Sequence, residues 1–507
     1  MTVKSGHNIY QIVHLFGVFG QPRGGKHGMR NDIIGRSEQC RRLQTCLEQE
    51  TAQLILVYGR RRVGKTYLIN EFFEGHFAFK ITGAYDQPKK IQLENFVAEL
   101  NRKCRKKWDT PGNWFQAFEL LRQYLEQLPQ DQKHVVFMDE MPWLDTHKSF
   151  FLPAFEFFWN DWGSTRHNLV LIVCGSAASW MDDKFSGNRG GLYNRHTCRM
   201  YLEPFTLQQT EKFLISRNIH WSRYEIVECY MIMGGIPYYL NLLDRQYSFN
   251  QNIDRLFFSK RGELWDEFDM LYKTLFTHSE HYIQIVEALN QKRGGLTREE
   301  LAQKTGISLN GSFSKMIDHL IASGFVSESS QYPQKKKMMR FRLSDPYTAF
   351  YLKFIKGQSG NDEHFWSYST DLPSRRAWEG FAFEQLCKAH ILQIKQKLGI
   401  DGVLSTVSVW SSKGNEELGI PGTQIDMVID RRDRTINLCE IQFSEDEYII
   451  GKDEEASLRN KKTAFRTLTG CRKTIQMTMI TTYGVKQNIY SGIIQNQVTM
   501  DDLFREK

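Results

Sequence analysis

The sequence lacks the features that would place it in several narrow classes of protein. Its 9 cysteines are scattered singly with no C-x-x-C pair, which predicts reduced thiols and argues against a disulfide framework or a zinc site. No apolar run approaches the ~18 to 20 residues of a membrane-spanning helix. The formal net charge is only +8, which is compatible with nucleic acid but too weak to indicate it. We therefore predict a soluble, cytoplasmic protein with no membrane partner.

The length of the chain predicts more than one domain. A chain of 507 residues with 41% hydrophobic and 13% aromatic residues is globular in composition and too long for a single core, so we expect about three or four domains.

Residues 1–30 hold a short apolar patch followed by Gly, Arg, Lys and His, without a clear signal-peptide cleavage site. We predict a disordered leader there, or a natural translation start at Met29.

The stretch 53–73 gives the strongest indication of function. An apolar run ends in G-R-R-R-V-G-K-T, the pattern G-x-x-x-x-G-K-[ST] between a strand and a helix. In such loops backbone N–H groups surround a phosphate, the lysine reaches the outer phosphates and the hydroxyl can bind Mg²⁺. A chance match is rare in this setting. The sequence therefore predicts an ATP and Mg²⁺ site that uses Gly59, Arg60, Arg61, Arg62, Val63, Gly64, Lys65 and Thr66.

A second buried strand is expected to complete this site. Residues 134–140 are an apolar run that ends in Asp139 and Glu140, and parallel sheets bind ligands at the carboxyl ends of their strands. We expect Asp139 to join the Mg²⁺ shell and Glu140 to polarise the attacking water. A strand followed by an acidic turn is the alternative.

Two further positions are candidates around the same site. The strand 169–176 ends at Ser176, whose hydroxyl could sense the outer phosphate, although a simple strand end at Gly-Ser fits equally well. Arg189, Arg195 and Arg199 are candidates for an arginine that stabilises charge on the phosphate, with Arg195 favoured; each could instead be a surface residue.

Several motifs occur together in one order. They are Gly35-Arg36-x-Glu38, the 59–66 loop, Met138-Asp139-Glu140-x-Pro142-Trp143-Leu144, Gly175-Ser176, Leu192-Tyr193-x-Arg195, Leu202-x-Pro204-Phe205 and Gly234-Gly235-Ile236-Pro237-Tyr238-Tyr239-Leu240. Over about residues 31–278 the chain resembles the prokaryotic AAA-family ATPases related to the STAND signalling NTPases. The resemblance implies that Arg36 lies by the base of the nucleotide and that Pro237 opens a lid helix beside it. We also expect that a homo-oligomer could form on ATP binding.

The order of helices and strands divides the first two thirds of the chain. We expect the ATPase core at 31–205, a helical lid at 206–278 and a winged helix at 279–345, with 308–323 as recognition helix and 331–337 as wing. The wing concentrates positive charge where a DNA backbone would be touched, through Lys335, Lys336, Lys337, Arg340 and Arg342. Such a module could equally serve as a packing spacer.

A linker at 346–375 leads to the last domain, 376–507. We predict a helix at 378–397 carrying Glu384, a strand at 403–410, a polar loop at 411–422 and a hairpin of strands 424–430 and 435–442. The hairpin carries Asp426 on its first strand and Glu440-x-Gln442 on its second. This resembles the Mg²⁺ site of PD-(D/E)xK nucleases, in which Asp426, Glu440 and the helix acid would share the ion. Gln442 stands where those nucleases usually have lysine, so an inactive domain of the same fold remains open.

The sequence thus predicts an α/β protein with a P-loop NTPase core, a helical lid, a winged helix and a C-terminal restriction-endonuclease-like α/β domain. We expect ATP hydrolysis whose nucleotide state controls a DNA-associated domain with nuclease-like catalytic residues Glu384, Asp426, Glu440 and Gln442. The alternative is a nucleotide-switched signalling or DNA-binding protein whose nuclease-like domain is inactive.

Overall fold

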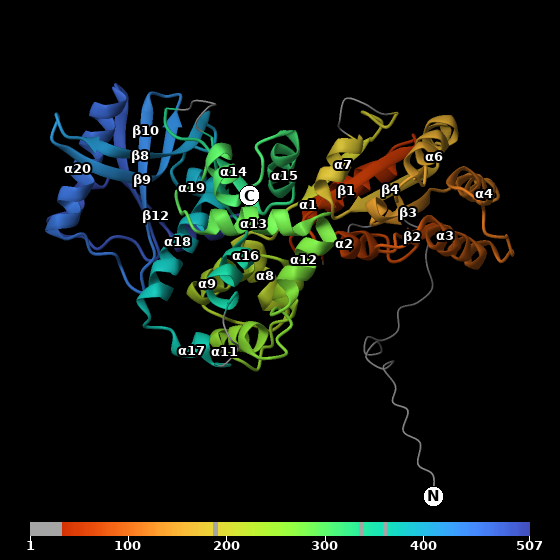
Figure 1. Cartoon of the computed structure of the whole chain (residues 1–507), viewed down its shortest axis with the longest axis horizontal. Helices are drawn as coiled ribbons and strands as arrows, with labels where there is room; N and C mark the ends of the chain where they lie inside the picture. The colour runs from red at the N-terminus through yellow and green to blue at the C-terminus, as the bar shows by residue number, and fades with distance from the viewer. Residues whose placement is uncertain (1–32, 186–190, 334–338, 358–361, 507) are drawn as a thin grey trace, which may run out of the picture.

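A computed structural model describes residues 33–185, 191–333, 339–357 and 362–506. The expected leader at 1–30, the candidate Arg189 and the wing residues Lys335, Lys336 and Lys337 lie outside the described residues. Figure 1 shows the first sheet at one end of the molecule, a second sheet at the other end and a helical middle between them.

The first sheet has five parallel strands in the order β2-β3-β4-β1-β5. Its strands are β1 Gln53–Gly59, β2 Phe79–Thr82, β3 His134–Asp139, β4 Leu169–Gly175 and β5 Cys198–Leu202. Strands β1 and β4 are buried on both faces, which explains why the sequence reads there as continuous apolar runs. Alternate residues serve two cores: Ile55 and Val57 pack on one face, and Leu54 and Leu56 pack on the other. The sheet confirms the predicted α/β P-loop core.

One group of helices alternates with the strands of this sheet along the chain, and a second group comes after its last strand. Those of the core are α1 Ser37–Glu48, α2 Lys65–Phe72, α3 Lys89–Cys104, α4 Trp114–Glu126, α5 Met141–Leu144, α6 Phe151–Phe157 and α7 Ala178–Phe185. The next group is α8 Leu207–Ser216, α9 Arg223–Met233, α10 Pro237–Asn241, α11 Phe249–Ile253 and α12 Glu267–Leu275. Capping boxes at Thr206, Ser222 and Ser248 fix where α8, α9 and α11 begin. Helix α9 is buried along most of its length because α8, α16 (Pro346–Phe350) and α18 (Pro373–Ala389) pack around it.

The segment predicted as a winged helix has three helices followed by an antiparallel hairpin. They are α13 Ser279–Asn290, α14 Arg298–Thr305 and α15 Gly311–Ala322, then β6 Val326–Ser329 and β7 Arg340–Leu343. Helix α15, the expected recognition helix, packs against α7 of the ATPase core, and the Tyr201 hydroxyl donates a 3.2 Å bond to the Ala322 carbonyl. The expected DNA-reading helix is therefore in contact with the core.

The hairpin itself is joined to the last domain. The amide of Tyr332 donates to the Val409 carbonyl at 2.9 Å, and the amide of Val409 donates to the Ser330 carbonyl at 3.0 Å. The two basic residues of β7 that the structure describes are also engaged: Arg340 contacts Glu300 at 3.2 Å, and the buried Arg342 contacts Glu384 at 3.4 Å. Arg340 and Arg342 thus do not form the solvent-facing basic wing that the sequence suggested.

The connection between the hairpin and the last domain is packed. It contains α16 Pro346–Phe350 and α17 Phe365–Tyr368, and Tyr347, Phe350 and Trp366 are buried in it. The segment 346–375, expected as a linker, therefore contributes buried aromatic side chains to the central core.

The second sheet has five strands in the order β12-β11-β10-β9-β8. They are β8 Ser405–Asn415, β9 Ile420–Arg431, β10 Thr435–Gln442, β11 Thr474–Thr481 and β12 Asn496–Thr499; β8, β9 and β10 are antiparallel, whereas β10, β11 and β12 are parallel. Helix α18 Pro373–Ala389 covers one face, and α20 Lys452–Thr469 covers the other. Short 3₁₀ turns, Ser491–Ile493 and Met500–Phe504, lie at the end.

Two predictions in this domain were wrong in detail. The helix expected at 378–397 begins at Pro373 and is divided at His390 into α18 and α19 Ile391–Lys397. At this position the His390 ring accepts a 3.1 Å bond from the Leu207 amide. The polar loop expected at 411–422 is mostly strand, since β8 runs to Asn415 and β9 begins at Ile420.

Over the described ranges, the structure has no helix that is long and apolar enough to cross a membrane.

Candidate nucleotide site and C-terminal acidic cluster

Two glycines shape the loop between β1 and α2. Gly59 has φ +142°, and a Cβ there would lie 2.5 Å from the Leu202 carbonyl oxygen, so the close approach of β5 requires glycine. Gly64 has φ +87° and precedes Lys65, the first residue of α2. The buried Lys65 ammonium donates to the carbonyls of Gly59 at 3.1 Å and Arg60 at 2.9 Å. The backbone thus curves around the ammonium group at the amino end of a helix.

Four side chains meet at the carboxyl edge of the sheet beside this loop. The Thr66 hydroxyl donates to the Asp139 carboxylate at 2.8 Å, which joins α2 to the end of β3. Glu140 follows in a left-handed conformation with φ +44°. Its carboxylate accepts bonds from the Ser176 amide at 3.0 Å and the Ser176 hydroxyl at 2.8 Å. The hydroxyl and carboxylate oxygens of Thr66 and Asp139 are ligands of the kind that Mg²⁺ prefers, so this donor set fits the ion.

Arg36 and Pro237 both lie at the phosphate loop. The Arg36 guanidinium donates to the Val63 carbonyl at 2.8 Å and to the Glu203 carbonyl at 3.0 Å. Burial lowers the pKa of Arg36 to about 10. Pro237 is the first residue of α10, and the amide of Tyr238 donates to the Arg62 carbonyl at 3.4 Å. The structure therefore brings the motifs from residues 35–38 and 234–240 to the loop.

The three arginines of the loop are directed toward other elements. Arg60 forms a buried ion pair with Asp345, which lies 285 residues away in sequence. Arg61 lies 5.9 Å from the ring of Trp143. Arg62 pairs with Glu267 at 2.7 Å and stacks on Tyr238 at 4.0 Å. The partners Asp345 and Glu267 could not be found from the sequence, because only the folded chain brings them near Arg60 and Arg62.

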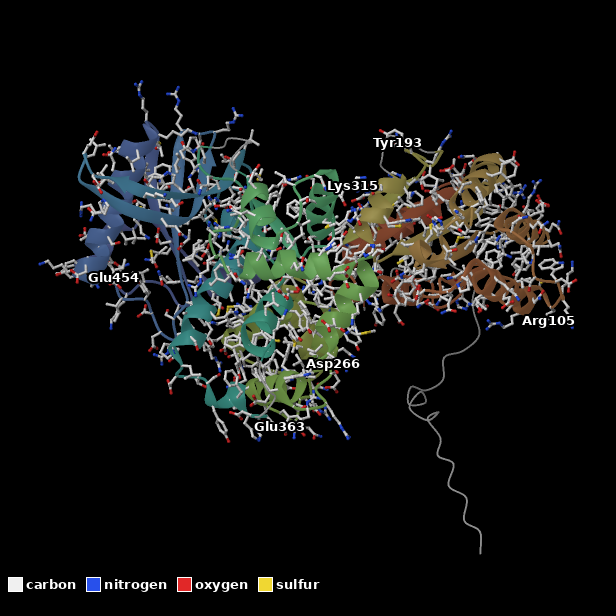
Figure 2. The ribbon with its side chains drawn as sticks, viewed as in Figure 1. Arg105, Tyr193, Asp266, Lys315, Glu363 and Glu454 are labelled. Carbon is white, nitrogen blue, oxygen red and sulfur yellow. The ribbon has the colours of Figure 1, made fainter. Side chains whose placement is uncertain are left out.

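Arg195 is not brought to the phosphate loop of its own chain. The strand β5 begins at Cys198, which pairs with Ile55, so Arg195 lies at the amino end of β1. The loop lies at the other end of β1, about 20 Å away at the rise of a strand. Figure 2 shows Tyr193, two residues earlier, projecting from the surface of the core. Arg199 pairs with Asp182 at 2.5 Å. A phosphate-sensing role for Arg195 would require a neighbouring copy of the chain.

The predicted acids of the C-terminal domain lie near one another, but each has a protein partner. The Asp426 carboxylate accepts a 3.1 Å bond from the Ile441 amide. Glu440 pairs with Lys461 of α20. Glu384 pairs with Lys388 and contacts Arg342 at 3.4 Å. Gln442 follows on β10 and is partly exposed.

These acids lie close enough for the charge of one to raise the pKa of another. Burial and then the Asp426 charge raise the pKa of Glu440 to about 8. Burial and then the Glu384 charge raise the pKa of Asp426. One oxygen of Glu440 is buried without a hydrogen-bond partner in the described part of the chain. Among the same residues, however, no group of three or more His, Cys, Asp or Glu is arranged to hold a metal ion. Lys388, Lys461 and Arg342 are the partners of these carboxylates, so the sharing of one Mg²⁺ ion by the three acids stays a prediction.

Comparisons with known proteins agree with the first site. Residues 34–243 match the model of a family described as an ATPase domain predominantly from Archaea. Together with the parallel sheet and the loop geometry, this match defines a P-loop ATPase domain. The matched residues end before the second sheet, so the nuclease-like resemblance of 376–507 stays a prediction.

Individual relatives and solved structures match different shares of the chain. An uncharacterized protein of Methanocaldococcus jannaschii is 23% identical over 388 residues, which are 76% of this chain and 83% of that protein. An uncharacterized ATP-binding protein of the same organism is 46% identical over 42 residues, 8% of this chain and 71% of that protein. A Walker-type ATPase of Pyrococcus abyssi has 20% identity and a TM-score of 0.48, with 64% of this chain and 97% of that chain covered.

Proposed function

We propose that the chain binds and hydrolyses ATP at the loop 59–66, and that the nucleotide state controls a DNA-associated C-terminal domain. The observation that supports ATP hydrolysis is a pair of side-chain hydrogen bonds near Lys65: one joins Thr66 to Asp139, and the other joins Ser176 to Glu140. These residues supply a phosphate-binding cation (Lys65), oxygen ligands for a metal ion (Thr66 and Asp139) and a carboxylate base (Glu140) at one edge of the sheet.

Each residue has a role that its contacts support. Lys65 would exchange the carbonyls of Gly59 and Arg60 for outer phosphate oxygens. Thr66 and Asp139 would hold Mg²⁺, which when bound offsets the negative charge of the phosphates. Glu140, held by both donors of Ser176, would orient a water molecule and accept its proton. Arg36 and Pro237 would line the nucleotide from two other elements.

Two substitutions test this assignment. Lys65→Ala should remove most ATP affinity, because the loop loses its positioned cation, and Glu140→Gln should bind ATP but hydrolyse it at least about 100-fold more slowly. Titration calorimetry and phosphate release measure the two effects. Lys90→Ala, an exposed lysine of α3, is the control for lost charge. Equal ATP binding by wild type and Lys65→Ala would refute the proposal.

For the C-terminal domain, two functions remain, and one observation favours each. The unpartnered oxygen of Glu440, a carboxyl group whose pKa is raised by burial and then by the Asp426 charge, supports a cation site for DNA cleavage. The pairing of Glu440 with Lys461 and of Glu384 with Lys388, together with Gln442, supports a binding module without catalysis.

A cleavage assay separates these functions. If the domain is nucleolytic, wild type should cut duplex DNA with Mg²⁺ or Mn²⁺, and Asp426→Ala should abolish cutting because the ion loses a carboxylate ligand. Glu447→Gln, which changes an exposed carboxylate of the same domain, is the control. Cutting that is equal in wild type and Asp426→Ala, or absent in both, would assign the domain to binding.

A further inference from the structure

Arg60 occupies an unusual environment for a loop arginine. Its side chain is buried, and its guanidinium stacks at 4.9 Å on the ring of Phe325. Burial lowers the pKa of Arg60, but the charge and hydrogen bond of Asp345, together with Tyr239 and Tyr272, outweigh burial and the pKa is raised. In the described parts of the chain, Nε and Nη2 have no hydrogen-bond partner, so the Asp345 ion pair is the main polar contact of this guanidinium.

Asp345 is the junction between the hairpin and α16. It lies two residues after the end of β7 and caps α16, since its carboxylate accepts bonds from the Thr348 amide at 3.0 Å and the Thr348 hydroxyl at 2.6 Å. Phe325 precedes β6 at the same open end of the hairpin, and its carbonyl accepts a 2.9 Å bond from the Ser344 amide. Arg60 therefore contacts the open end of the hairpin, beside both of its strands, and the residue that caps α16.

The same residue also contacts the phosphate-binding lysine. The Arg60 carbonyl accepts the 2.9 Å bond from Lys65 Nζ, so the backbone of Arg60 touches the predicted phosphate cation while its side chain touches Asp345. When Lys65 turns to a phosphate, this carbonyl loses its donor. A backbone shift of Arg60 then has to carry Asp345 with it, because separating a buried ion pair leaves an uncompensated charge.

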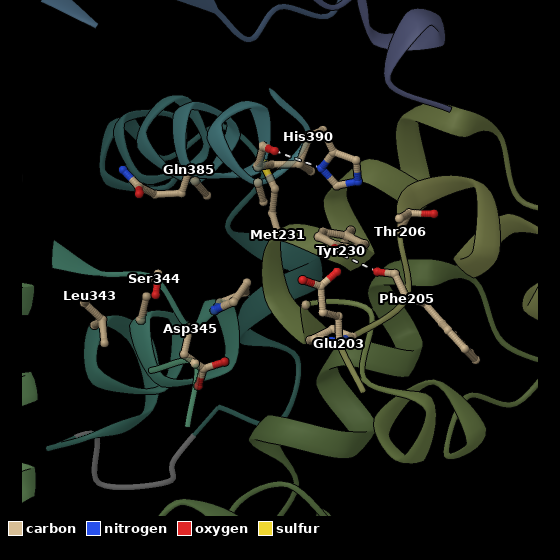
Figure 3. A pocket seen from close by; sticks show the side chains of 18 of the residues that line it. Glu203, Phe205, Thr206, Tyr230, Met231, Leu343, Ser344, Asp345, Gln385 and His390 are labelled. Carbon is tan, nitrogen blue, oxygen red and sulfur yellow. Dashed lines mark hydrogen bonds between the residues drawn. The ribbon is translucent and has the colours of Figure 1, made fainter. Parts of the chain in front are cut away.

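A cavity beside this junction leaves room for such a shift. It has a volume of about 300 Å³ and is lined by Arg60, Glu203, Asp345, Trp378, Gln385 and His390, among others. Figure 3 shows Leu343, Ser344 and Asp345 on one side of it, with Glu203 and Phe205 across from them. Neighbouring elements can move into this space without compressing a packed core.

From these contacts we propose that the Arg60–Asp345 pair transmits the occupancy of the phosphate loop to the hairpin and α16. This inference rests on the proposed ATP binding and specifies how that site is coupled to the second half of the chain. Asp345 acts here as a positioning residue through Arg60. The hairpin is bonded to β8 through Ser330 and Tyr332, so the movement would reach the C-terminal sheet.

Hydrogen exchange with mass spectrometry on the full chain tests the relay. In wild type, ATP with Mg²⁺ should change the exchange of amides in 326–333 and 340–350 by about tenfold, the effect of a coupling free energy of ordinary size. Asp345→Asn and Asp345→Ser both keep a helix-capping acceptor but remove the charge. Both variants should keep ATP affinity within about twofold and lose this response. Glu267→Gln breaks the Arg62 pair on the same loop and should keep the response.

Each alternative outcome is decisive. Retention of the response in either Asp345 variant would overturn the relay, and so would its loss in Glu267→Gln. Loss of ATP binding in both Asp345 variants would also overturn it, since the pair would then only shape the loop. A wild-type chain that binds ATP without any response would refute this inference alone, whereas a chain that binds no ATP would refute the proposed function.

Discussion

Ionisation of the Glu440 carboxyl group lowers the stability of the folded domain. Its pKa is raised to about 8 from 4.5 by burial and by Asp426, so between these values the folded state holds a proton that the unfolded chain has released. The contribution of Glu440 to stability is therefore largest on the acid side of this window and is lost as the pH rises from about 5 to about 8.

The pH effect can be measured by comparing variants. Thermal unfolding at pH 5.5 and pH 8 should show a loss of stability in wild type that is smaller in Glu440→Gln, because the amide does not ionise. Glu447→Gln, in which an exposed carboxylate is changed, should behave as wild type. Identical pH dependence in wild type and Glu440→Gln would show that Lys461 keeps Glu440 ionised across the whole range.

At the residue level, the sequence predicted best what is local. Lys65 and Thr66 follow from eight consecutive residues, and Asp139 and Glu140 follow from the end of one apolar strand. Arg195 could not be placed in the same way, because its position depends on the direction in which β5 pairs with β1. The partners Asp345 and Lys461 were missed as contacts, since nothing in a single sequence indicates which distant charges will meet.

A hydrogen bond at His390, between α18 and α19, joins the last domain to the helical lid. The Leu207 amide at the start of α8 donates to the His390 ring, whose other nitrogen lies 2.9 Å from the Leu386 carbonyl. The sequence around 378–397 is helical in pattern throughout, so this interruption could not be predicted. It coincides with a contact between a side chain of this helix and the backbone of another unit, and not with a proline or glycine.

Substitution of His390 tests the importance of this joint. His390→Leu should destabilise the protein by about 1 to 3 kcal/mol, because the buried Leu207 amide loses its acceptor. His390→Gln should cost less, since its amide oxygen can accept the same bond. Thermal unfolding of the two variants gives the comparison. Equal unfolding temperatures for Leu and Gln would show that the ring matters only for packing.

At the scale of the whole molecule, the charges available to DNA are fewer than the sequence suggested. Helix α15 packs on the core, Arg340 and Arg342 are paired with acids, and Figure 2 shows Lys315 of α15 on the side of the molecule near the ATPase core. The wing lysines Lys335, Lys336 and Lys337 therefore carry the prediction of DNA contact.

A salt titration tests that prediction. Fluorescence anisotropy with a duplex of arbitrary sequence should show salt-sensitive binding, and replacing the three lysines by alanine should lower the slope by up to about three counterions. Arg340→Ala should leave the slope unchanged, because this guanidinium is already paired with Glu300. An unchanged slope in the triple variant would place DNA contact elsewhere or nowhere on the chain.

The final turn returns the chain to the middle of the molecule, where Figure 1 marks its end. Arg223 of α9 pairs with Asp501 at 3.0 Å, Lys397 of α19 pairs with Asp502 at 3.2 Å, and Lys212 of α8 pairs with Glu506 at 3.3 Å. The second sheet is thus anchored where the chain enters it through α18 and again where the chain leaves it. With the bonds between Val409 and the hairpin residues Ser330 and Tyr332, the last domain is held to the rest of the chain at several separate places, so a change in the helical middle could reach it through more than one connection.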